Sequence, residues 1–161
     1  MRLIVPLILP LIPLASRWVL QQETIMNAKG RSLNAAEMSD ARSAGVQHPE
    51  RIRIMAVPVI LPPQTFPLAL AGKLVNLIGP QTAGITLRYG IYIREDCSDY
   101  RRNRNLYVHE FVHVGQYERL GSVNAFLKKY LRECLVEGYP FGPLEQEAIR
   151  EAQRITDSKG E

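Results

Sequence analysis

The sequence His109-Glu110-Phe111-Val112-His113 combines the residue types of a catalytic metal site at a spacing that fits a helix. Residues four apart lie on one face of a helix, so the imidazoles of His109 and His113 can bind one ion. Glu110 lies one step around, where its carboxylate can reach a water on that ion without binding the metal. Zinc lowers the pKa of such a water to about 7. The pattern therefore predicts a zinc site with Glu110 as the general base for attack on a carbonyl carbon.

The residues around the two histidines favour this interpretation over a chance match. The chain contains three histidines, and two of them lie in this motif. The neighbouring positions are apolar and predict a buried helix: Leu106, Val108, Phe111, Val112 and Val114. Buried imidazole and carboxylate groups need partners, because an unpaired polar group in an apolar surrounding is costly. A metal would supply the partner; the alternative is a core helix whose histidines are hydrogen-bonded to other protein groups.

A catalytic zinc site needs a third protein ligand, for which any aspartate or glutamate is formally a candidate. The last predicted helix, 143–155, contains Glu145 and Glu147. At about 100° per residue, the first glutamate shares a face with small or apolar residues, namely Ala148, Ile149 and Ala152. Glu147 lies on the opposite, charged side, which we expect to face solvent, so Glu145 is favoured as the ligand. His48, the remaining histidine, stands beside a proline and is more typical of a turn.

Together these two motifs resemble those of the gluzincin type of zinc peptidase. Gln116 follows the HExxH sequence, and residues 143–148 read P-L-E-Q-E-A. This is similar to an uncharacterised bacterial HExxH domain of contractile injection systems and polymorphic toxins, with the pattern HExxHxxQ followed by P-x-E-x-E-A-D. Segments 45–51 and 90–94 also resemble that family, so the resemblance covers roughly residues 34–152.

The resemblance implies a minimal zincin-like fold and hydrolysis of a peptide or protein substrate, with Zn²⁺ as cofactor. It also implies that Glu145, the first glutamate of the second motif, completes the ligand set of His109 and His113. One position departs from the family, because Ile149 stands where an aspartate usually supports the ligands. The hydrogen bonding around the ligands is therefore expected to differ in this protein.

Three further residues could support this chemistry. Gln116 lies one helical turn beyond His113, where it could hydrogen-bond beside the ligands or serve as a packing or capping residue. Tyr117 and Tyr139 could stabilise the oxyanion of a tetrahedral intermediate. Each of these tyrosines is, however, more typical of a packing residue.

Composition and charge narrow the partners. Hydrophobic residues make up 46% of the chain and charged residues 22%, which is typical of a globular domain and excludes a disordered one. The net charge is +4, and Arg101, Arg102 and Arg104 form a basic cluster just before the site helix. The cluster could attract an acidic substrate or nucleic acid, but a solvated loop is expected because no aromatic residues are interleaved with it. No clear nucleic-acid partner is therefore predicted.

The elements that must position these residues follow from capping residues, glycines and prolines. The predicted elements are helices through Met26 and over 34–44, strands over 51–60 and 84–94, and helices over 105–120, 123–137 and 143–155. Segment 84–94 is either one bent strand or a tight hairpin, and segment 68–78 is either a helix or another buried element. This order predicts an α+β fold in one domain, 1–161, with an N-terminal apolar segment and helix in 1–30 and the catalytic core in 34–157.

The N-terminal residues 3–14 form an apolar run interrupted by three prolines. The run is similar to the hydrophobic part of a signal peptide and is too short and broken for a membrane span. We favour a retained element that continues into a helix burying Leu14, Trp18 and Ile25 and that contacts a membrane at most peripherally. A cytoplasmic or membrane-peripheral location is thus favoured over secretion, and Cys97 and Cys134 are expected to be two thiols rather than one disulfide.

Two functions fit these observations. The first is a zinc-dependent peptidase that hydrolyses peptide bonds through metal-activated water. The alternative is a non-catalytic, zinc-stabilised module that binds a protein partner or a membrane surface. Glu110 favours the peptidase, because a purely structural zinc site has no use for a carboxylate beside its ligand.

Overall fold

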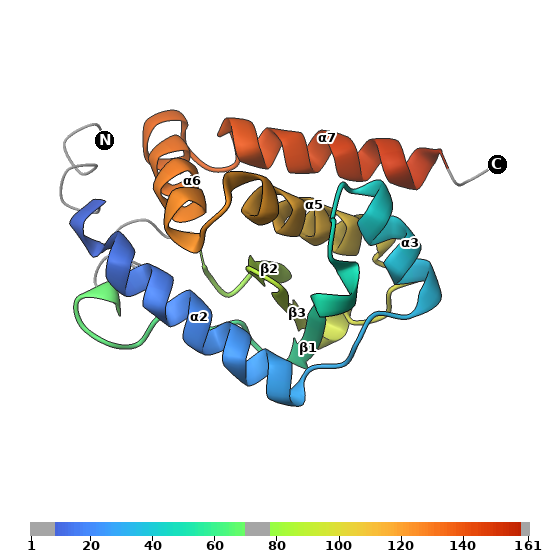
Figure 1. The fold of residues 1–161 in the computed structure, drawn as a ribbon, viewed down its shortest axis with the longest axis horizontal. Coiled ribbons are helices and arrows are strands. Elements are labelled where there is room, and N and C mark those ends of the chain that lie inside the picture. Colours follow the sequence, from blue (N-terminus) through green and yellow to red (C-terminus); the bar gives the residue numbers. More distant parts are fainter. Residues whose placement is uncertain (1–8, 70–77, 159–161) are drawn as a thin grey trace.

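Within residues 9–69 and 78–158, which the computed structural model describes, five α-helices surround a small β-sheet (Figure 1). The helices are α2 (Ile12–Lys29), α3 (Ala35–Ser43), α5 (Arg104–Leu120), α6 (Val123–Glu137) and α7 (Pro143–Asp157). The strands are β1 (Arg53–Val57), β2 (Gly84–Leu87) and β3 (Gly90–Arg94). The order of helices, then strands, then helices confirms the predicted α+β class.

Most predicted element boundaries agree with the structure to within a few residues. The first strand is shorter than the predicted 51–60, because Pro49–Arg51 form a 3₁₀ turn before it and Pro58 follows its last residue, Val57. Residues 70–77, the greater part of segment 68–78, lie outside the described residues, as do residues 3–8 of the N-terminal apolar run.

A tight hairpin joins β2 to β3, which decides between the two forms predicted for segment 84–94. Arg88 and Tyr89 form its turn, and Arg88 has a φ of 66°. Glu23 of α2 holds this turn through an ion pair of 3.2 Å to Arg88 and a hydrogen bond of 3.3 Å from the Tyr89 N–H. Because β3 also pairs in parallel with β1, β2 lies at one edge of the sheet.

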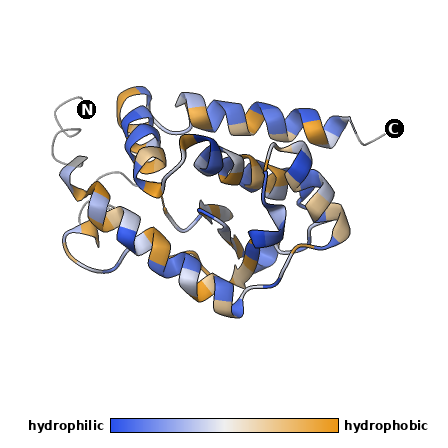
Figure 2. Cartoon of the chain, in the orientation of Figure 1, coloured by the Kyte–Doolittle hydropathy of each residue, from blue (hydrophilic) through white to orange (hydrophobic). Residues whose placement is uncertain are grey.

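The sheet lies between α2 and α5, and α7 covers the other side of α5 (Figure 1). The sheet residues that pack toward α2 are Met55, Ile85, Leu87 and Tyr92. Those that pack toward α5 are Ile54, Ile91 and Ile93. Every residue of α5 from 107 to 117 is buried except His109, as expected for the predicted core helix. Figure 2 shows that α7 is mostly hydrophilic with hydrophobic residues at intervals, which fits a helix that buries one side only.

The buried side of α2 differs from the prediction. Leu14 and Ile25 are 44% and 40% exposed, and Trp18 is half-buried. The buried residues of this helix are Ile12, Val19, Glu23 and Met26. Met26 lies so close to Gly90 that a Cβ at this glycine would approach the Met26 Cε to 2.2 Å. Contact with the β2–β3 hairpin therefore decides which side of α2 is buried. The number of apolar residues on each side of the helix does not decide it.

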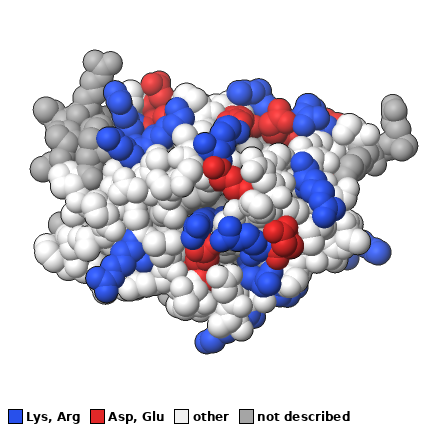
Figure 3. Space-filling view, viewed as in Figure 1, with Lys and Arg blue, Asp and Glu red and all other residues white. Residues whose placement is uncertain are grey.

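The predicted basic cluster is only partly a solvated loop. Arg101 and Arg102 are exposed, but Arg104 begins α5, and its Nε lies 2.7 Å from Oδ2 of the buried Asp40 in α3. The expectation of a solvated side chain was wrong for Arg104, because a buried carboxylate needs a counter-charge. Elsewhere, basic and acidic side chains are interspersed on the face drawn in Figure 3.

Two further expectations concern the thiols and the membrane. Cys97 and Cys134 are both free thiols in this structure, as predicted. Among the described residues, no helix is both long enough and apolar enough to cross a membrane.

Candidate metal centre

The structure brings His109, His113 and Glu145 together, although the third residue comes from a different helix. The Nε2 atoms of the two histidines are 3.1 Å apart. Nε2 of His109 lies 3.3 Å from Oε1 of Glu145, and Nε2 of His113 lies 3.3 Å from Oε2. One ligand atom from each residue can be chosen so that all lie within 4.8 Å of one another. The helical angles thus placed Glu145 correctly on the buried side of α7, where it is 3% exposed.

The spacing of these atoms fits a tetrahedral zinc site. With zinc–ligand distances of about 2.0–2.1 Å, two ligand atoms of a tetrahedron are separated by about 3.3 Å. The two Nε2 atoms are 3.1 Å apart, and each lies 3.3 Å from one of the two oxygens of Glu145, which is close to that value. With a single oxygen of Glu145 as the ligand atom, the three donor atoms lie within 4.8 Å of one another. Two imidazoles and one carboxylate also match the ligand set of catalytic zinc sites that leave a fourth position open. The chemistry and the geometry of the donor atoms therefore both fit zinc.

Gln116 orients His113 and ties α5 to α7. Its amide nitrogen donates to the carbonyl oxygen of Leu144 at 2.8 Å and to Oε2 of Glu147 at 3.2 Å. The amide oxygen therefore faces His113, where it accepts a hydrogen bond of 2.8 Å from Nδ1. With the proton on Nδ1, the lone pair of Nε2 points to the other ligands. Of the two roles that the sequence left open for Gln116, the structure shows the hydrogen bond to His113, a candidate ligand.

Glu133 of α6 positions the first turn of α7, which carries Glu145. This helix begins at Pro143 after Gly142, which offers no side-chain cap. The carboxylate of Glu133 instead accepts the Leu144 N–H at 2.8 Å. A carboxylate at this place also complements the positive end of the helix dipole. The beginning of α7, and with it the position of Glu145, is therefore held by contacts to both α5 and α6.

Tyr130 of α6 is a site residue that the sequence did not reveal. Its hydroxyl donates a hydrogen bond of 2.8 Å to Oε2 of Glu145, and its ring packs edge-on against His113 with centroids 5.7 Å apart. Burial and the nearby charge of Glu145 raise the pKa of Tyr130, so it stays a hydrogen-bond donor. A tyrosine on the inner side of a helix needs a hydrogen-bond partner for its hydroxyl. That need is the one signal by which Tyr130 could have been identified as a site residue.

The charges of the cluster favour a cation. Burial opposes a charge on His113, but hydrogen bonding to Glu145 and the charge of Glu110 raise its pKa above the ordinary value. Burial also opposes a charge on Glu145, yet hydrogen bonds from His109 and His113 hold its pKa below the ordinary value. Two carboxylates thus face two imidazoles in a partly desolvated site, and a positive charge between them is stabilised.

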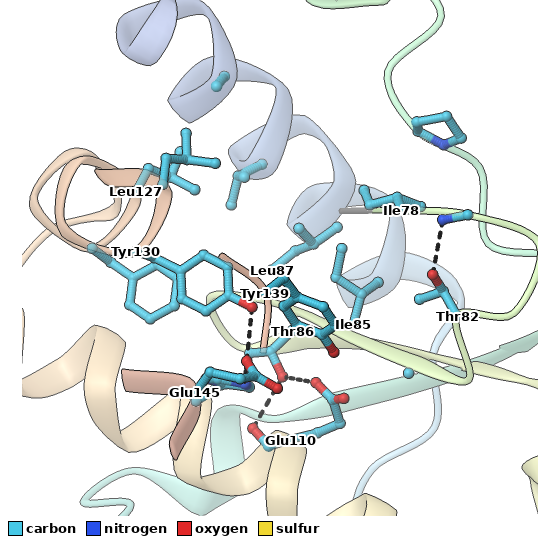
Figure 4. Close-up of a pocket in the computed structure, with 18 of the residues that line it drawn as sticks. Ile78, Thr82, Ile85, Thr86, Leu87, Glu110, Leu127, Tyr130, Tyr139 and Glu145 are labelled. Carbon is cyan, nitrogen blue, oxygen red and sulfur yellow. Dashed lines mark hydrogen bonds and ion pairs between the residues drawn. The ribbon is translucent and has the colours of Figure 1, made fainter. Parts of the chain in front are cut away.

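Glu110 lies beside the ligands and is held by the edge strand. Thr86 of β2 donates its hydroxyl to Oε2 of Glu110 at 2.6 Å, and the same hydroxyl lies 3.0 Å from the Glu110 carbonyl oxygen. Gly84 leaves room for the other carboxylate oxygen, since a Cβ there would approach Oε1 to 2.7 Å. Figure 4 shows Glu110 and Glu145 with Thr86, Tyr130 and Tyr139 around one space. Thr86 is a second contact that the sequence did not reveal.

A cavity of about 850 Å³ opens at this cluster. Its walls come from α2, from segment 78–87, from α5 and α6, and from the first half of α7, with further residues from the connecting segments, namely Leu11, Pro62, Pro63, Leu68, Tyr139 and Pro140. His109, Glu110, His113 and Glu145 all line it. The candidate ligands and the candidate base therefore share one space that is large enough for a substrate.

The remaining candidates take less direct positions. Glu147 lies outside the cluster as predicted and pairs with Arg119 at 2.8 Å, but it is half-buried rather than solvated, because it also accepts a hydrogen bond of 3.2 Å from Gln116. His48 is exposed and lies outside the cluster. Tyr117 stacks on Phe126 with centroids 3.7 Å apart, which makes it a packing residue that also lines the cavity. Tyr139 lines the cavity and is 56% exposed.

Ile149 did not take the position expected for it. It was placed on the packing face of α7 with Ala148 and Ala152, and both alanines are fully buried. Ile149 itself is 41% exposed and lies at the wall of the cavity. It therefore contributes apolar surface where the resembling family has an aspartate, and Gln116 and Tyr130 supply the hydrogen bonds around the ligands.

No protein family, curated protein or solved structure matches this chain. The likeness to gluzincins therefore stays a prediction from the two motifs. Support for a metal centre comes from the geometry of the cluster and from the chemistry of its donor atoms.

Proposed function

We propose that this protein is a zinc-dependent peptidase in which His109, His113 and Glu145 hold the ion and Glu110 is the general base. The observation that carries the proposal is the convergence of three ligand atoms beside Glu110, at the wall of one large cavity. A hydrogen-bonded histidine pair in a closed core would need no cavity, and it would need no second carboxylate beside it.

The side chains divide the chemistry among them. When bound, zinc acts as a Lewis acid that lowers the pKa of a water and polarises the substrate carbonyl. Thr86 holds Oε2 of Glu110, while Oε1 has no hydrogen-bond partner among the described residues. Glu110 takes the proton of the attacking water at Oε1 and passes it to the leaving amine. Gln116 and Tyr130 keep His113 and Glu145 in their orientations during these steps.

The oxyanion formed by attack on the carbonyl needs a donor from the protein or the ion. Tyr130 uses its hydroxyl on Glu145. Tyr139 lies at the cavity, and burial followed by the charges of Glu145 and Glu110 raises its pKa to about 12, so it keeps its proton at neutral pH. Tyr139 is therefore the better candidate for this role, and Tyr117 serves in packing.

Metal content is the first test of this proposal. The purified protein should hold close to one zinc ion per chain, and His109→Ala or His113→Ala should lose most of it, because two imidazoles of one helix face provide most of the ligand set. Elemental analysis of the three proteins measures this directly. Full zinc content in both variants would end the proposal.

Glu110→Gln separates the peptidase from a non-catalytic zinc module. The variant keeps the size of the side chain but cannot take a proton, so cleavage of a peptide library should fall by about 10²–10⁴-fold. Its zinc content should equal that of the wild type, since Glu110 is not a ligand. Cleavage is measured by mass spectrometry with and without a chelator. Unchanged cleavage by Glu110→Gln would exclude the assigned base, and a zinc-loaded wild type that cleaves nothing would favour the module.

A further inference from the structure

The cavity beside the candidate metal centre has walls that are mostly apolar, with polar side chains such as Gln81, Thr82 and Asn105 among them. Its charged lining residues among those described are Glu110 and Glu145, and no lysine, arginine or aspartate lines it. The wall that faces them is built from three separate elements, with Trp18 and Val19 on α2, Ile85 and Leu87 on β2, and Phe126 and Leu127 on α6. Figure 4 shows Leu127, Ile85 and Leu87 directed into this space.

The cavity is large enough to hold more than one apolar group of a ligand. Its volume of about 850 Å³ lies in the upper part of the range of sites that enclose whole small ligands. A charged or strongly polar side chain placed against the apolar wall of α2, β2 and α6 would lose its hydration without gaining a partner. Bulky apolar side chains would bury their surface there at a gain, so the walls select for them.

The edge strand favours a peptide as the carrier of these apolar groups. One side of β2 pairs with β3, and its other side pairs with no strand in the part of the chain that the structure describes. Residues 84–87 of β2 all line the cavity, and Thr86 also holds Glu110. An extended peptide can pair with such an edge, and every second side chain then points to the same face. The cavity wall, the edge strand and the candidate base would thus act on one extended chain.

We propose that the substrate is an extended peptide with bulky apolar side chains, such as leucine or phenylalanine, beside the bond that is cut. Those side chains lie against the wall formed by α2, β2 and α6. That the bound peptide is also cut rests on the proposed peptidase function. Recognition of the peptide itself depends on the cavity and does not require the metal.

Trp18 makes the test possible, because it is the single tryptophan of the chain and lines the cavity. The full-length Glu110→Gln protein, which binds without cutting, is titrated with an acetylated hexapeptide that has Phe-Leu at its centre. A matched hexapeptide with Ser-Asn there is the control. We expect the Phe-Leu peptide to change the Trp18 emission saturably and to bind at least about tenfold more tightly, since each buried methylene contributes severalfold in affinity.

Two variants connect the binding to the cavity wall. Leu127→Asp places a carboxylate among the apolar residues and should weaken binding of the Phe-Leu peptide at least about tenfold. Leu20→Asp makes the same change on α2 at a residue that is 41% exposed and outside the lining, and it should leave binding unchanged. If Leu127→Asp does not fold, as circular dichroism would reveal, Leu127→Ala replaces it and should weaken binding severalfold.

The outcomes separate this proposal from the peptidase function. Equal affinity for the two peptides, or unchanged binding by a folded Leu127 variant, would overturn it. Saturable binding of dodecanoate without binding of either peptide would also overturn it and would assign the cavity to a lipid chain. The titrations are repeated after chelation. Selective peptide binding by a protein that holds no zinc and cuts nothing would leave the cavity assignment standing while the peptidase proposal fails.

Discussion

Two buried polar clusters lie on the same helix, α5, and they differ in how their charges are balanced. At the beginning of the helix, Arg104 forms two hydrogen bonds to the buried Asp40, at 2.7 and 3.0 Å, and Tyr100 donates to the same carboxylate. In the middle of the helix, His109 and His113 face Glu145 beside an 850 Å³ cavity.

The difference indicates which cluster is built for stability and which for binding. A guanidinium and a carboxylate neutralise each other in a fixed geometry, and the first cluster adds a hydroxyl to complete the set. The second cluster is lined by two carboxylates and two titratable imidazoles, with no lysine or arginine among the described residues of its cavity. Under the proposed function, a cation from outside the chain completes this second cluster.

The largest expected effect separates the two clusters by stability. Asp40→Ala leaves the Arg104 guanidinium, which is partly exposed, without its carboxylate and should lower the free energy of unfolding by about 3 kcal/mol. Its zinc content should stay at the wild-type level below the unfolding transition. Urea unfolding and elemental analysis measure the two quantities. Asp99→Ala, at the exposed partner of Arg102, is the matched control and should change stability by less than about 1 kcal/mol. Loss of zinc from folded Asp40→Ala would break the comparison.

The second effect concerns the two glutamates of α7. Glu145→Ala removes a proposed ligand and should lower zinc affinity by more than the roughly 10–100-fold seen when an outer hydrogen-bond partner is lost. Glu147→Ala removes an ion pair with the half-exposed Arg119 and the weaker of two acceptors of the Gln116 amide nitrogen, whose hydrogen bond to Leu144 remains, so it should lower the affinity much less. Competition with a fluorescent zinc chelator gives both affinities. Equal losses in the two variants would mean that α7 does not present Glu145 alone to the ion.

A smaller effect tests Tyr130. Tyr130→Phe keeps the ring against His113 but removes the hydrogen bond to Glu145. Zinc affinity should fall by about 10–100-fold, because an outer partner no longer holds the ligand carboxylate. Tyr139→Phe removes a more exposed hydroxyl that also lies near Glu145, and it should lower the affinity less than Tyr130→Phe. A Tyr130→Phe protein that binds zinc as well as the wild type would show that packing alone positions Glu145.

The smallest expected effect tests whether α6 stays packed against the core around Cys134. Burial, followed by the charge of Glu145, raises the pKa of Cys134 to about 12, so almost no thiolate exists at pH 8. Alkylation of the native protein at pH 8 should therefore label the half-exposed Cys97 and spare Cys134. After unfolding, both should be labelled, as read from the masses of proteolytic fragments. Fast labelling of Cys134 in the native protein would mean that α6 opens away from the core.

Local patterns in the sequence predicted the parts of this molecule that depend on neighbours along the chain. Asn34 and Glu37 form a capping box at the beginning of the helix predicted over 34–44, with hydrogen bonds of 2.8 and 2.9 Å. Gly121 ends α5 with a φ of 79°, and Glu145 faces inward at the angle expected for a helix that begins at Pro143. Each of these features is decided within one or two turns, so the sequence contains the information.

Contacts between distant segments were not predictable in the same way. Thr86 and Glu110 are 24 positions apart, and Arg104 and Asp40 are 64 apart. The rotation of α2 was mistaken for the same reason, since its buried side is decided by Met26 against the β2–β3 hairpin. Such pairs form only when whole elements pack against each other. The spacing of apolar residues along one element does not reveal which other element it will contact.

The hydrogen bonds of Gln116 link assembly of the site to folding. Gln116 and Leu144 are 28 positions apart, and their contact forms only when α7 docks on α5. The same docking event brings Glu145 to the two histidines and fixes the ring of His113. A chain whose α7 is not yet docked offers only two freely rotating imidazoles, which is a weak chelate. Capture of the ion would therefore accompany the final step of folding, and release by denaturant would follow undocking of α7 rather than loss of α5.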